Sequence, residues 1–339
     1  MKIARFKFSS AVTTVHFDSS ISRLAKLAGK SRAIIITDEN VYAAHSGKLR
    51  GWDVIVLKPG EEFKVQETVD AVLMQLIRME ADRETLLVGV GGGVITDLTG
   101  FVAAIYMRGL AFGFVPTTLL ALVDAAIGGK NGIDVGPYKN MVGTIRQPAF
   151  ILHDLSLLNS LPESEWRNGM AEVVKHACIH NRLMFDKLKV LTISALRRNR
   201  KKLSDLVFEN ATFKLKLVQR DEWERGERKK LNFGHTLGHA IENQYEISHG
   251  EAISIGMMAA CRISEEILGF HEKEEVKMLL EKFGLPTSAL YNREKIFQVL
   301  AMDKKRQGAT IQFILLKKIG RAQIQKIPLA RLKTYLEQK

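Results

Sequence analysis

Short apolar runs separated by amphipathic stretches fill the first half of the chain. The runs are nearly continuous in Val, Ile and Leu, which is typical of strands covered on both faces of a parallel sheet. They lie at Ala33 to Thr37, Val54 to Leu57, Thr85 to Val90, Phe112 to Val115 and Phe150 to His153. Their alternation with helical stretches predicts an α/β domain with a mainly parallel sheet over residues 1–160.

The second half of the chain carries longer periodicities, of the kind that predict amphipathic helices. They cover Glu163 to Ile179, Leu183 to Leu196, Ser204 to Gln219, Phe233 to Gln244, Gly250 to Leu268 and Lys273 to Phe283. Pro162 suits the start of the first helix, and Gly284 the end of the last. Two β-rich runs, Thr310 to Leu316 and Arg321 to Ile327, predict a hairpin before a terminal helix. Residues 161–339 are therefore predicted to form a second, mainly α-helical domain.

The composition agrees with two domains, since the chain has 339 residues, of which 46% are hydrophobic. Its start alternates apolar and polar residues and lacks the apolar core of a secretory leader. No apolar run approaches the length of a membrane span. The two cysteines, Cys178 and Cys261, suit a reducing compartment. We therefore expect a cytoplasmic protein without a membrane partner.

A formal net charge of +13 favours an acidic partner, which by charge alone is nucleic acid, a membrane surface or a phosphorylated metabolite. The sequence contains no aromatic-basic RNA motif and no finger spacing, so a nucleic-acid partner is not supported. Basic runs such as Arg197 to Lys202 are typical of solvated helix faces. The charge therefore does not identify the partner by itself.

A glycine segment, Gly91 to Gly93, ends one strand and opens a helical run. Backbone N–H groups at such a helix start can cradle a phosphate, which predicts a Rossmann-like nucleotide-binding domain. Val94 stands where the GxGxxG fingerprint counted from Gly89 needs glycine, so that motif is absent. Asp97 follows within one turn, and Thr117 and Thr118 follow the next strand at the same predicted sheet edge. A tight turn, a dipole partner at Asp97 and an N-cap at Thr117 are the structural alternatives.

Lys130, Lys139 and Asn140 lie on a glycine-rich connection after Asp124. We expect this connection to be a substrate loop, because loops often carry binding residues and these side chains can converge on an anion. Arg108, at the end of the preceding helix, is either part of the same anion site or a partner of the helix dipole.

Three of the nine histidines fall close together in two adjacent predicted helices. His235 and His239 are four residues apart and share a helix face, and His249 opens the next helix. Thr236 follows His235, so the HExxH motif of zinc proteases is absent. The histidines indicate a metal site without deciding which of them are ligands.

Glu172 is the carboxylate that such a site needs, because it is a charge among apolar neighbours. A buried carboxylate is costly unless it is paired or binds a metal. An ion pair to Lys175 is the alternative, and His176, one turn away, is a competing ligand. Two histidines and one carboxylate suit a catalytic Zn²⁺, with Co²⁺ or Mn²⁺ also acceptable.

In this order along the chain, the motifs resemble those of the sugar phosphate cyclases, and most closely those of the 3-dehydroquinate synthase family. The similarity covers nearly the whole chain. It runs through PGEEFK at 59–64, GGGVITDLTGF at 91–101, YMRG at 106–109, VPTTLLALVDAAIGGKNGI at 115–133, KNMVG at 139–143, GMAEVVKHA at 169–177, LNFGHTLGHAIE at 231–242, HGEAISIGM at 249–257 and DKK at 303–305. The chain departs from the family pattern at Asn131, at Thr96 and in the 134–138 segment DVGPY.

The resemblance implies that Glu172, His235 and His249 bind the divalent metal, Zn²⁺ or Co²⁺. It places NAD against Asp38, Asn40, Glu61, Lys64, Gly91, Gly92, Gly93, Asp97, Thr117, Thr118, Lys130 and Lys139. It places the substrate against Arg108, Asp124, Lys130, Lys139, Asn140, Lys175, Lys214, Arg228, Asn232, His239 and Lys304, with Lys305 as the alternative to Lys304. Within these sets the catalytic residues are expected to be His239, Lys130, Lys175 and Asn140.

The reaction that the resemblance implies converts 3-deoxy-D-arabino-heptulosonate 7-phosphate to 3-dehydroquinate and phosphate in the shikimate pathway. In the family, NAD⁺ is transiently reduced during oxidation at C5, phosphate is eliminated, and hydride return, ring opening and an aldol step follow. Alternatives are a sister cyclase of the 2-deoxy-scyllo-inosose or valiolone type and a metal-dependent polyol dehydrogenase. A homodimer is expected by resemblance.

Overall fold

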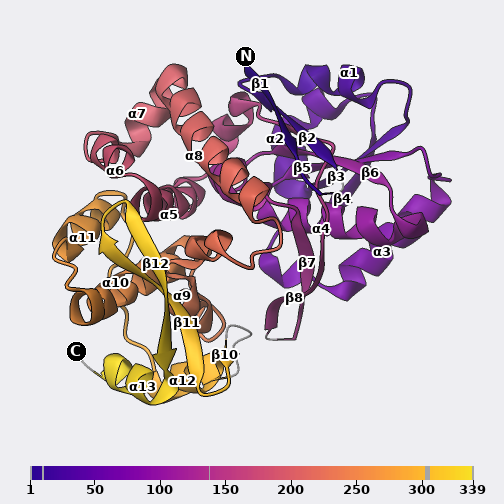
Figure 1. The fold of residues 1–339 in the computed structure, drawn as a ribbon. Helices are drawn as coiled ribbons and strands as arrows, with labels where there is room; N and C mark the ends of the chain where they lie inside the picture. Colours follow the sequence, from indigo (N-terminus) through magenta and orange to yellow (C-terminus); the bar gives the residue numbers. More distant parts are fainter. Residues whose placement is uncertain (1, 10, 137, 302–305, 338–339) are drawn as a thin grey trace. The chain divides into compact units, whose positions relative to one another are not determined.

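The computed structural model of the protein describes residues 2–9, 11–136, 138–301 and 306–337. The chain divides into two compact units (Figure 1). The first contains the residues up to Trp166 together with Arg197–Trp223, and the second contains Arg167–Leu196 together with the residues from Glu224 onward. This grouping differs from the single division expected at residue 160, because the segment 197–223 packs with the first unit.

The first unit is built on a seven-stranded sheet with the order β1-β2-β9-β6-β5-β3-β4. The strands are β1 Lys2–Lys7, β2 Val12–Phe17, β3 Ala33–Asp38, β4 Asp53–Leu57, β5 Leu86–Gly91, β6 Ala111–Pro116 and β9 Phe150–Leu152. All five predicted strands are present and parallel to their neighbours, whereas β1 pairs with β2 in antiparallel fashion. The predicted α/β domain is confirmed, with a mixed sheet.

Helices cover both faces of this sheet, as the continuous apolar strands require. They are α1 Leu24–Ala28, α2 Glu39–Leu49, α3 Gln66–Arg78, α4 Gly93–Ile105 and α8 Arg200–Arg220. Along β3, Ile34 and Ile36 enter one core cluster and Ile35 enters the other, so the strand is buried on both sides.

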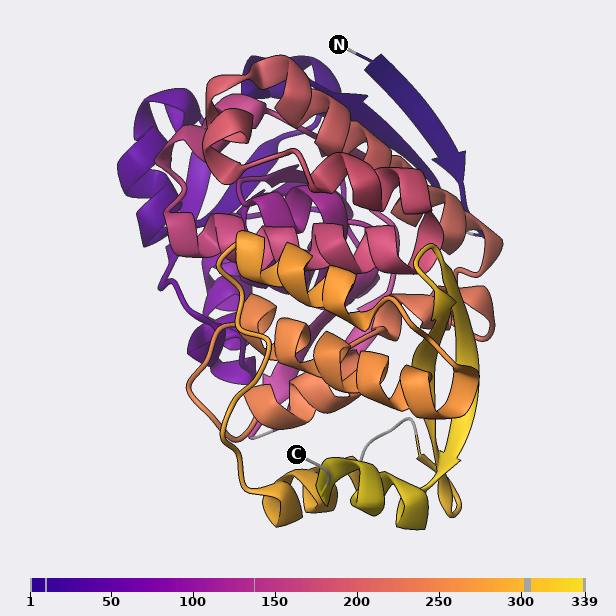
Figure 2. The same ribbon diagram turned by 90° about the vertical axis from the view of Figure 1, so that its left-hand side faces the viewer.

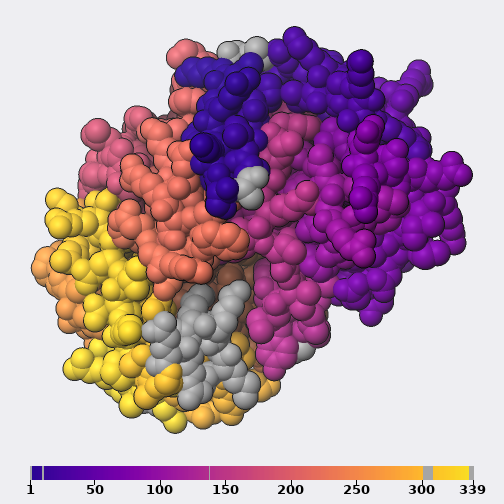
Figure 3. Space-filling model, turned by 45° about the vertical axis from the view of Figure 1, so that its right-hand side comes forward, coloured from indigo at the N-terminus to yellow at the C-terminus, as the bar shows by residue number. Residues whose placement is uncertain are grey.

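The long helix α8 belongs to the first unit because of its apolar face. Ala211, Leu215 and Val218 on this face join the core cluster beneath the sheet. At the surface, α8 (coral) lies beside β1 (indigo), where the Lys2 ammonium is 4.2 Å from the centre of the Phe208 ring (Figure 3).

The expected substrate loop is a β-hairpin, and the loop prediction was wrong. Strands β7 Lys130–Val135 and β8 Tyr138–Ile145 pair in antiparallel fashion. The hairpin packs on α4, where a Cβ on Gly100 would lie only 2.0 Å from Asn131 Oδ1. Asn131 and Ile133 are buried at this contact. Burial against the helix therefore orders a segment whose glycine content suggested a loop.

The second unit is mainly helical, as predicted. Its elements are α6 Arg182–Leu188, α9 His235–Glu242, α10 His249–Leu268, α11 Lys273–Lys282, α12 Arg293–Ala301, β10 Arg306–Gln307, β11 Thr310–Lys318, β12 Arg321–Pro328 and α13 Leu329–Glu337, while α5 Glu163–His180 and α7 Ile193–Arg198 cross the division between the units. Strands β10, β11 and β12 form a small antiparallel sheet. The predicted hairpin and terminal helix are thus present.

One helix prediction in this unit needs correction, and one helix was missed. The helix expected over Leu183 to Leu196 is two helices, because the Thr192 hydroxyl accepts a hydrogen bond from Ala195 N–H and starts α7 anew. Helix α12 was not predicted. Helices α9 and α10 lie side by side (Figures 1 and 2). No helix in the described ranges has both the length and the apolar character to cross a membrane.

Candidate functional site

The glycine segment lies where β5 ends and α4 begins, with Gly92 as the N-cap of the helix. Thr117, at the end of β6, donates its backbone N–H to Gly91 O at 3.0 Å. A Cβ on Gly92 would approach Thr118 Cγ2 to 3.1 Å. The predicted glycines and threonines therefore meet at the carboxyl edge of the sheet, where ligands of open α/β folds bind.

The two threonines differ in their hydroxyl groups. Thr118 Oγ1 accepts a hydrogen bond from Ala121 N–H at 3.1 Å, so Thr118 caps the next turn and the N-cap considered at Thr117 is one residue later. Thr117 Oγ1 is buried and has no hydrogen-bond partner among the described residues. A buried hydroxyl without a partner costs free energy, which a polar ligand at this edge would recover.

Lys64 joins several predicted site residues of the first unit. Its side chain is buried, and its ammonium lies 2.7 Å from Asp97 and 3.4 Å from Glu61. The ammonium also donates to Asn140 Oδ1 at 2.7 Å. Burial lowers the pKa of Lys64, but the carboxylates of Asp97 and Glu61 outweigh that effect and raise the pKa above its ordinary value. Lys64 is therefore a fixed cation between the sheet edge and the hairpin.

Two further residues that were predicted to contact NAD, Asp38 and Asn40, lie at the end of β3. Asp38 accepts a hydrogen bond from Val41 N–H at 2.9 Å and caps α2. Burial raises the pKa of Asp38, although this hydrogen bond opposes the shift. Asn40 is exposed in the first turn of α2. Both residues thus share the carboxyl edge of the sheet with the glycine segment.

The predicted substrate residues of the first unit come from four segments. Lys214 on α8 lies 2.8 Å from Asp124 Oδ1 and donates to the Asp124 carbonyl at the same distance. Lys130 opens β7 with an exposed side chain, and Lys139 on β8 is half-buried. Arg108 is exposed in a turn with left-handed backbone, at φ 67°. Such a conformation in a non-glycine residue is strained and often found at functional sites.

The metal candidates converge in the second unit. Ligand atoms of Glu172, His235 and His249 all lie within 4.8 Å of one another. Glu172 Oε1 is 3.2 Å from His249 Nε2 and 3.5 Å from His235 Nε2. Glu172 is fully buried, and its other carboxylate oxygen forms an ion pair with Lys175. The ion pair and the histidine cluster, which were alternatives in the sequence, therefore occur together.

The two histidines have partners that leave a metal-binding nitrogen facing Glu172. His235 Nδ1 donates to Phe233 O at 3.1 Å, which places the lone pair on Nε2. His249 Nδ1 lies 3.5 Å from Glu242 Oε2. Burial lowers the pKa of His249, but hydrogen bonds to Glu172 and Glu242 outweigh it and raise the pKa to about 10. Such carboxylate and carbonyl partners are usual for histidines that bind metals.

A second cluster shares one of these histidines. Ligand atoms of His239, Glu242 and His249 also lie within 4.8 Å of one another. The His239 ring is 5.1 Å from the His235 ring and 6.3 Å from the His249 ring, centre to centre. Glu242 was missed in the sequence, although it lies three residues after His239 on the same helix face. His176, which the sequence left as a competing metal ligand, is fully buried.

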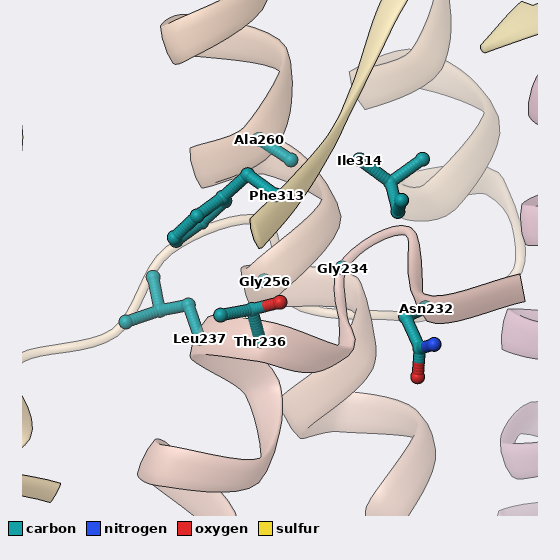
Figure 4. Close-up of a pocket in the computed structure, with 8 residues that line it drawn as sticks. All are labelled: Asn232, Gly234, Thr236, Leu237, Gly256, Ala260, Phe313 and Ile314. Atoms are coloured by element: carbon teal, nitrogen blue, oxygen red, sulfur yellow. The ribbon is translucent and has the colours of Figure 1, made fainter. Parts of the chain in front are cut away.

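Close packing of α9 against α10 brings the histidines together. A Cβ on Gly256 would lie 2.0 Å from Gly234 O, and one on Gly238 would lie 2.9 Å from Ala252 O. Figure 4 shows Gly234 and Gly256 at this crossing, where the surrounding residues leave no room for a water molecule. A capping box of Ser248 and Glu251 starts α10 at His249.

The other predicted residues of the second unit are Lys175, Arg228 and Asn232. Lys175 and Arg228 are buried. Asn232 Nδ2 donates to Glu224 Oε1 at 2.6 Å. Lys304 and its alternative Lys305 lie outside the described residues.

Comparison with known proteins identifies relatives along most of the chain. The family model of the 3-dehydroquinate synthase N-terminal region matches residues 54–168, and that of the C-terminal region matches residues 169–306. The curated 3-dehydroquinate synthase of Pyrococcus abyssi is 43% identical over 320 residues, covering 91% of this chain and 94% of the relative. That of Bacillus pumilus is 38% identical over 346 residues, covering 96% and 94%.

Solved structures of sister cyclases have the same fold. A 2-deoxy-scyllo-inosose synthase complexed with carbaglucose-6-phosphate, NAD⁺ and Co²⁺ superposes with a TM-score of 0.86 at 26% identity, over 99% of each chain. The 2-epi-5-epi-valiolone synthase ValA from Streptomyces hygroscopicus, with NAD⁺ and Zn²⁺ bound, gives 0.87 at 25% identity, over 99% of this chain and 98% of that one.

Proposed function

The chain belongs to the 3-dehydroquinate synthase family, and we propose that it converts 3-deoxy-D-arabino-heptulosonate 7-phosphate to 3-dehydroquinate and phosphate. This is a phosphate-eliminating lyase step of the shikimate pathway. The observation that carries the proposal is the Glu172, His235 and His249 cluster, whose ligand atoms lie within 4.8 Å of one another. It occurs in a chain that also carries a glycine-lined sheet edge suited to a nucleotide.

The cluster fits a divalent cation by its chemistry. Two imidazoles and a carboxylate are the donors that catalytic Zn²⁺ and Co²⁺ sites use, and they leave positions open for a substrate. The anionic surroundings that raise the pKa of His249 to about 10 would equally attract a cation in place of the proton. We therefore propose Glu172, His235 and His249 as the metal ligands.

The sheet edge fits NAD for two reasons. Gly91, Gly92 and Gly93 carry no side chains to block a phosphate, and the buried Thr117 hydroxyl has no partner among the described residues. We propose that the cofactor contacts Asp38, Asn40, Glu61, Lys64, Gly91, Gly92, Gly93, Asp97, Thr117, Thr118, Lys130 and Lys139. When bound, NAD⁺ supplies reversible hydride acceptance, and the metal supplies polarisation of the hydroxyl being oxidised.

The chain's own residues would bind the substrate anions and move protons. Five of the proposed substrate residues are cations that suit a phosphate and a carboxylate: Arg108, Lys130, Lys139, Lys214 and Arg228. Three of the remaining proposed contacts, Asp124, Asn140 and Asn232, suit hydroxyl groups. The fourth, Lys304, suits an anionic group. Lys175, held against Glu172, and His239, whose imidazole can both donate and accept a proton, are the proposed proton carriers.

A sister cyclase activity is the second candidate, because structures of 2-deoxy-scyllo-inosose and valiolone-type synthases superpose well. The two curated 3-dehydroquinate synthases are nearer in sequence, at 43% and 38% identity, than these two structures, at 26% and 25%. A polyol dehydrogenase of the same fold would instead release NADH. A cytoplasmic location and a homodimeric state remain predictions.

Phosphate release from the heptulosonate phosphate tests the proposal. The metal-loaded protein with NAD⁺ should release phosphate, chelation should stop the release, and Zn²⁺ or Co²⁺ should restore it. Turnover of glucose 6-phosphate in place of the heptulosonate phosphate would favour a 2-deoxy-scyllo-inosose type of reaction. Absence of release from the metal-loaded, NAD⁺-supplied protein would rule out the proposed activity.

A further inference from the structure

The β7–β8 hairpin carries a bulge directly opposite Asp134. Ile133 pairs with Val142, but the next pair is Val135 with Tyr138. Three residues of β8, at positions 139–141, therefore face the single residue Asp134. Bulges of this kind turn side chains to new directions and recur beside active sites. This one carries Lys139 and Asn140, both in the proposed substrate set.

Asp134 holds the backbone of this bulge. Asn140 has left-handed backbone, with φ 55°, and its N–H cannot follow the regular ladder. That N–H donates to Asp134 Oδ1 at 2.6 Å. The Asp134 side chain is buried whereas Asn140 is exposed, so the bond is partly buried, and its carboxylate acceptor makes it stronger than a hydrogen bond between neutral groups.

Asp134 is also hydrogen-bonded to Lys64, one of the residues that we propose contact NAD. Asp134 N–H donates to Lys64 O at 2.8 Å. Lys64 in turn donates to Asn140 Oδ1 at 2.7 Å and pairs with Asp97 at 2.7 Å. Asp134, Asn140 and Lys64 thus form a closed ring of three hydrogen bonds that fixes Asn140 by its backbone and by its side chain.

We propose that Asp134 is a positioning residue, which holds the Lys139–Asn140 bulge in register with the Lys64–Asp97 pair so that substrate and nucleotide contacts are aligned. The inference rests on the proposed function for the identity of the substrate. Asp134 itself need not touch the substrate. It lies in the 134–138 segment, where the chain departs from the family pattern.

Two substitutions separate the role of Asp134 as a hydrogen-bond acceptor, which positions the bulge, from the effect of its negative charge. Asp134→Ala removes the acceptor of the Asn140 N–H, whereas Asp134→Asn retains an acceptor oxygen without the charge. We expect Asp134→Ala to raise the KM for the heptulosonate phosphate about tenfold, as expected for a lost charge-assisted hydrogen bond. Asp134→Asn should stay within about threefold of wild type. Hydrogen exchange at the Asn140 amide should accelerate in Asp134→Ala and much less in Asp134→Asn.

Asp154→Ala is the matched control for a merely structural effect. Asp154 is also a buried carboxylate of the first unit, and it accepts hydrogen bonds from Ile21 N–H and Ser156 N–H, each at 3.0 Å. Its loss should lower the melting temperature and leave the KM unchanged. In Asp134→Ala the NAD⁺ dissociation constant, measured by calorimetry, should change less than the KM, because the Lys64–Asp97 pair remains.

Three outcomes would overturn the positioning role. They are an unchanged KM and unchanged amide exchange in Asp134→Ala, an equal loss in Asp134→Asn, and a KM change matched by Asp154→Ala. Absence of phosphate release in the wild type would instead refute the proposed function. The exchange measurement would then still decide whether Asp134 holds the bulge, since it needs no turnover.

Discussion

Gly256→Ala should damage the metal site without touching a ligand. The added Cβ would lie 2.0 Å from Gly234 O and 2.8 Å from Gly238 N. Carbon and oxygen atoms do not normally approach closer than about 3.3 Å, and both obstacles are backbone atoms that cannot rotate away. Helices α9 and α10 must therefore separate locally by on the order of 1 Å.

Such a separation has two measurable consequences. Overpacking of a core typically costs about 1–3 kcal/mol, and we expect the upper end here because backbone is involved. His235 follows Gly234 on one side of the crossing and His249 is on α10, so their distance changes too. Metal sites tolerate about 0.2 Å in ligand distances, and bound metal should therefore fall.

Urea denaturation and metal analysis after gel filtration would measure both effects. Gly47→Ala is the control, because Gly47 lies in helix α2 and an added Cβ meets nothing within 4 Å. That variant should gain about 0.5–1 kcal/mol from helix propensity and keep its metal. Wild-type stability and metal content in Gly256→Ala would refute the packing argument.

The remaining predictions concern ligands, cofactor and pH. Glu172→Ala should lower bound metal and phosphate release together, and normal metal content would refute the ligand assignment. Lys64→Met should weaken NAD⁺ binding at least about tenfold in calorimetry, because it leaves Asp97 without its cation. Lys48→Met is the control, because Lys48 is an exposed lysine of α2 that donates to Ser156 Oγ, and it should not weaken binding; equal affinities of the two variants would contradict this. Complete burial lowers the pKa of His153 from its ordinary 6.5 to about 3. Between these two pH values the unfolded chain binds a proton that the folded chain excludes, so the free energy of unfolding is highest above pH 6.5 and falls as the pH decreases toward 3. The loss is about 2 kcal/mol at pH 5, and His153→Leu should show a correspondingly flatter dependence in urea denaturation between pH 7 and 5; an unchanged slope would contradict it.

The sequence predicted the parallel strands well, because strands such as Ala33–Asp38 are apolar on both faces and short. It did not predict that α8 packs on the first unit, since an amphipathic pattern shows that a helix has an apolar face but not which core covers it. The hairpin was predicted as a loop for a related reason. Its order comes from the contact of Asn131 with Gly100, which is distant in the sequence.

The metal cluster could be predicted only in part. Spacing placed His235 and His239 on one face but left His176 and His239 as rival ligands, and the choice of Glu172, His235 and His249 came from the family resemblance. The structure brings that set together and also forms a second cluster through Glu242. Spacing cannot separate these sets, because the distances depend on how closely α9 and α10 pack.

Recycling of the cofactor tests the central claim most directly. The heptulosonate phosphate would be supplied in large excess over NAD⁺, with phosphate and the absorbance of NADH followed together. The account predicts that all the substrate releases its phosphate while no NADH accumulates, because each hydride taken at C5 is returned. Phosphate release that stops at the amount of NAD⁺, or NADH that accumulates with turnover, would contradict it.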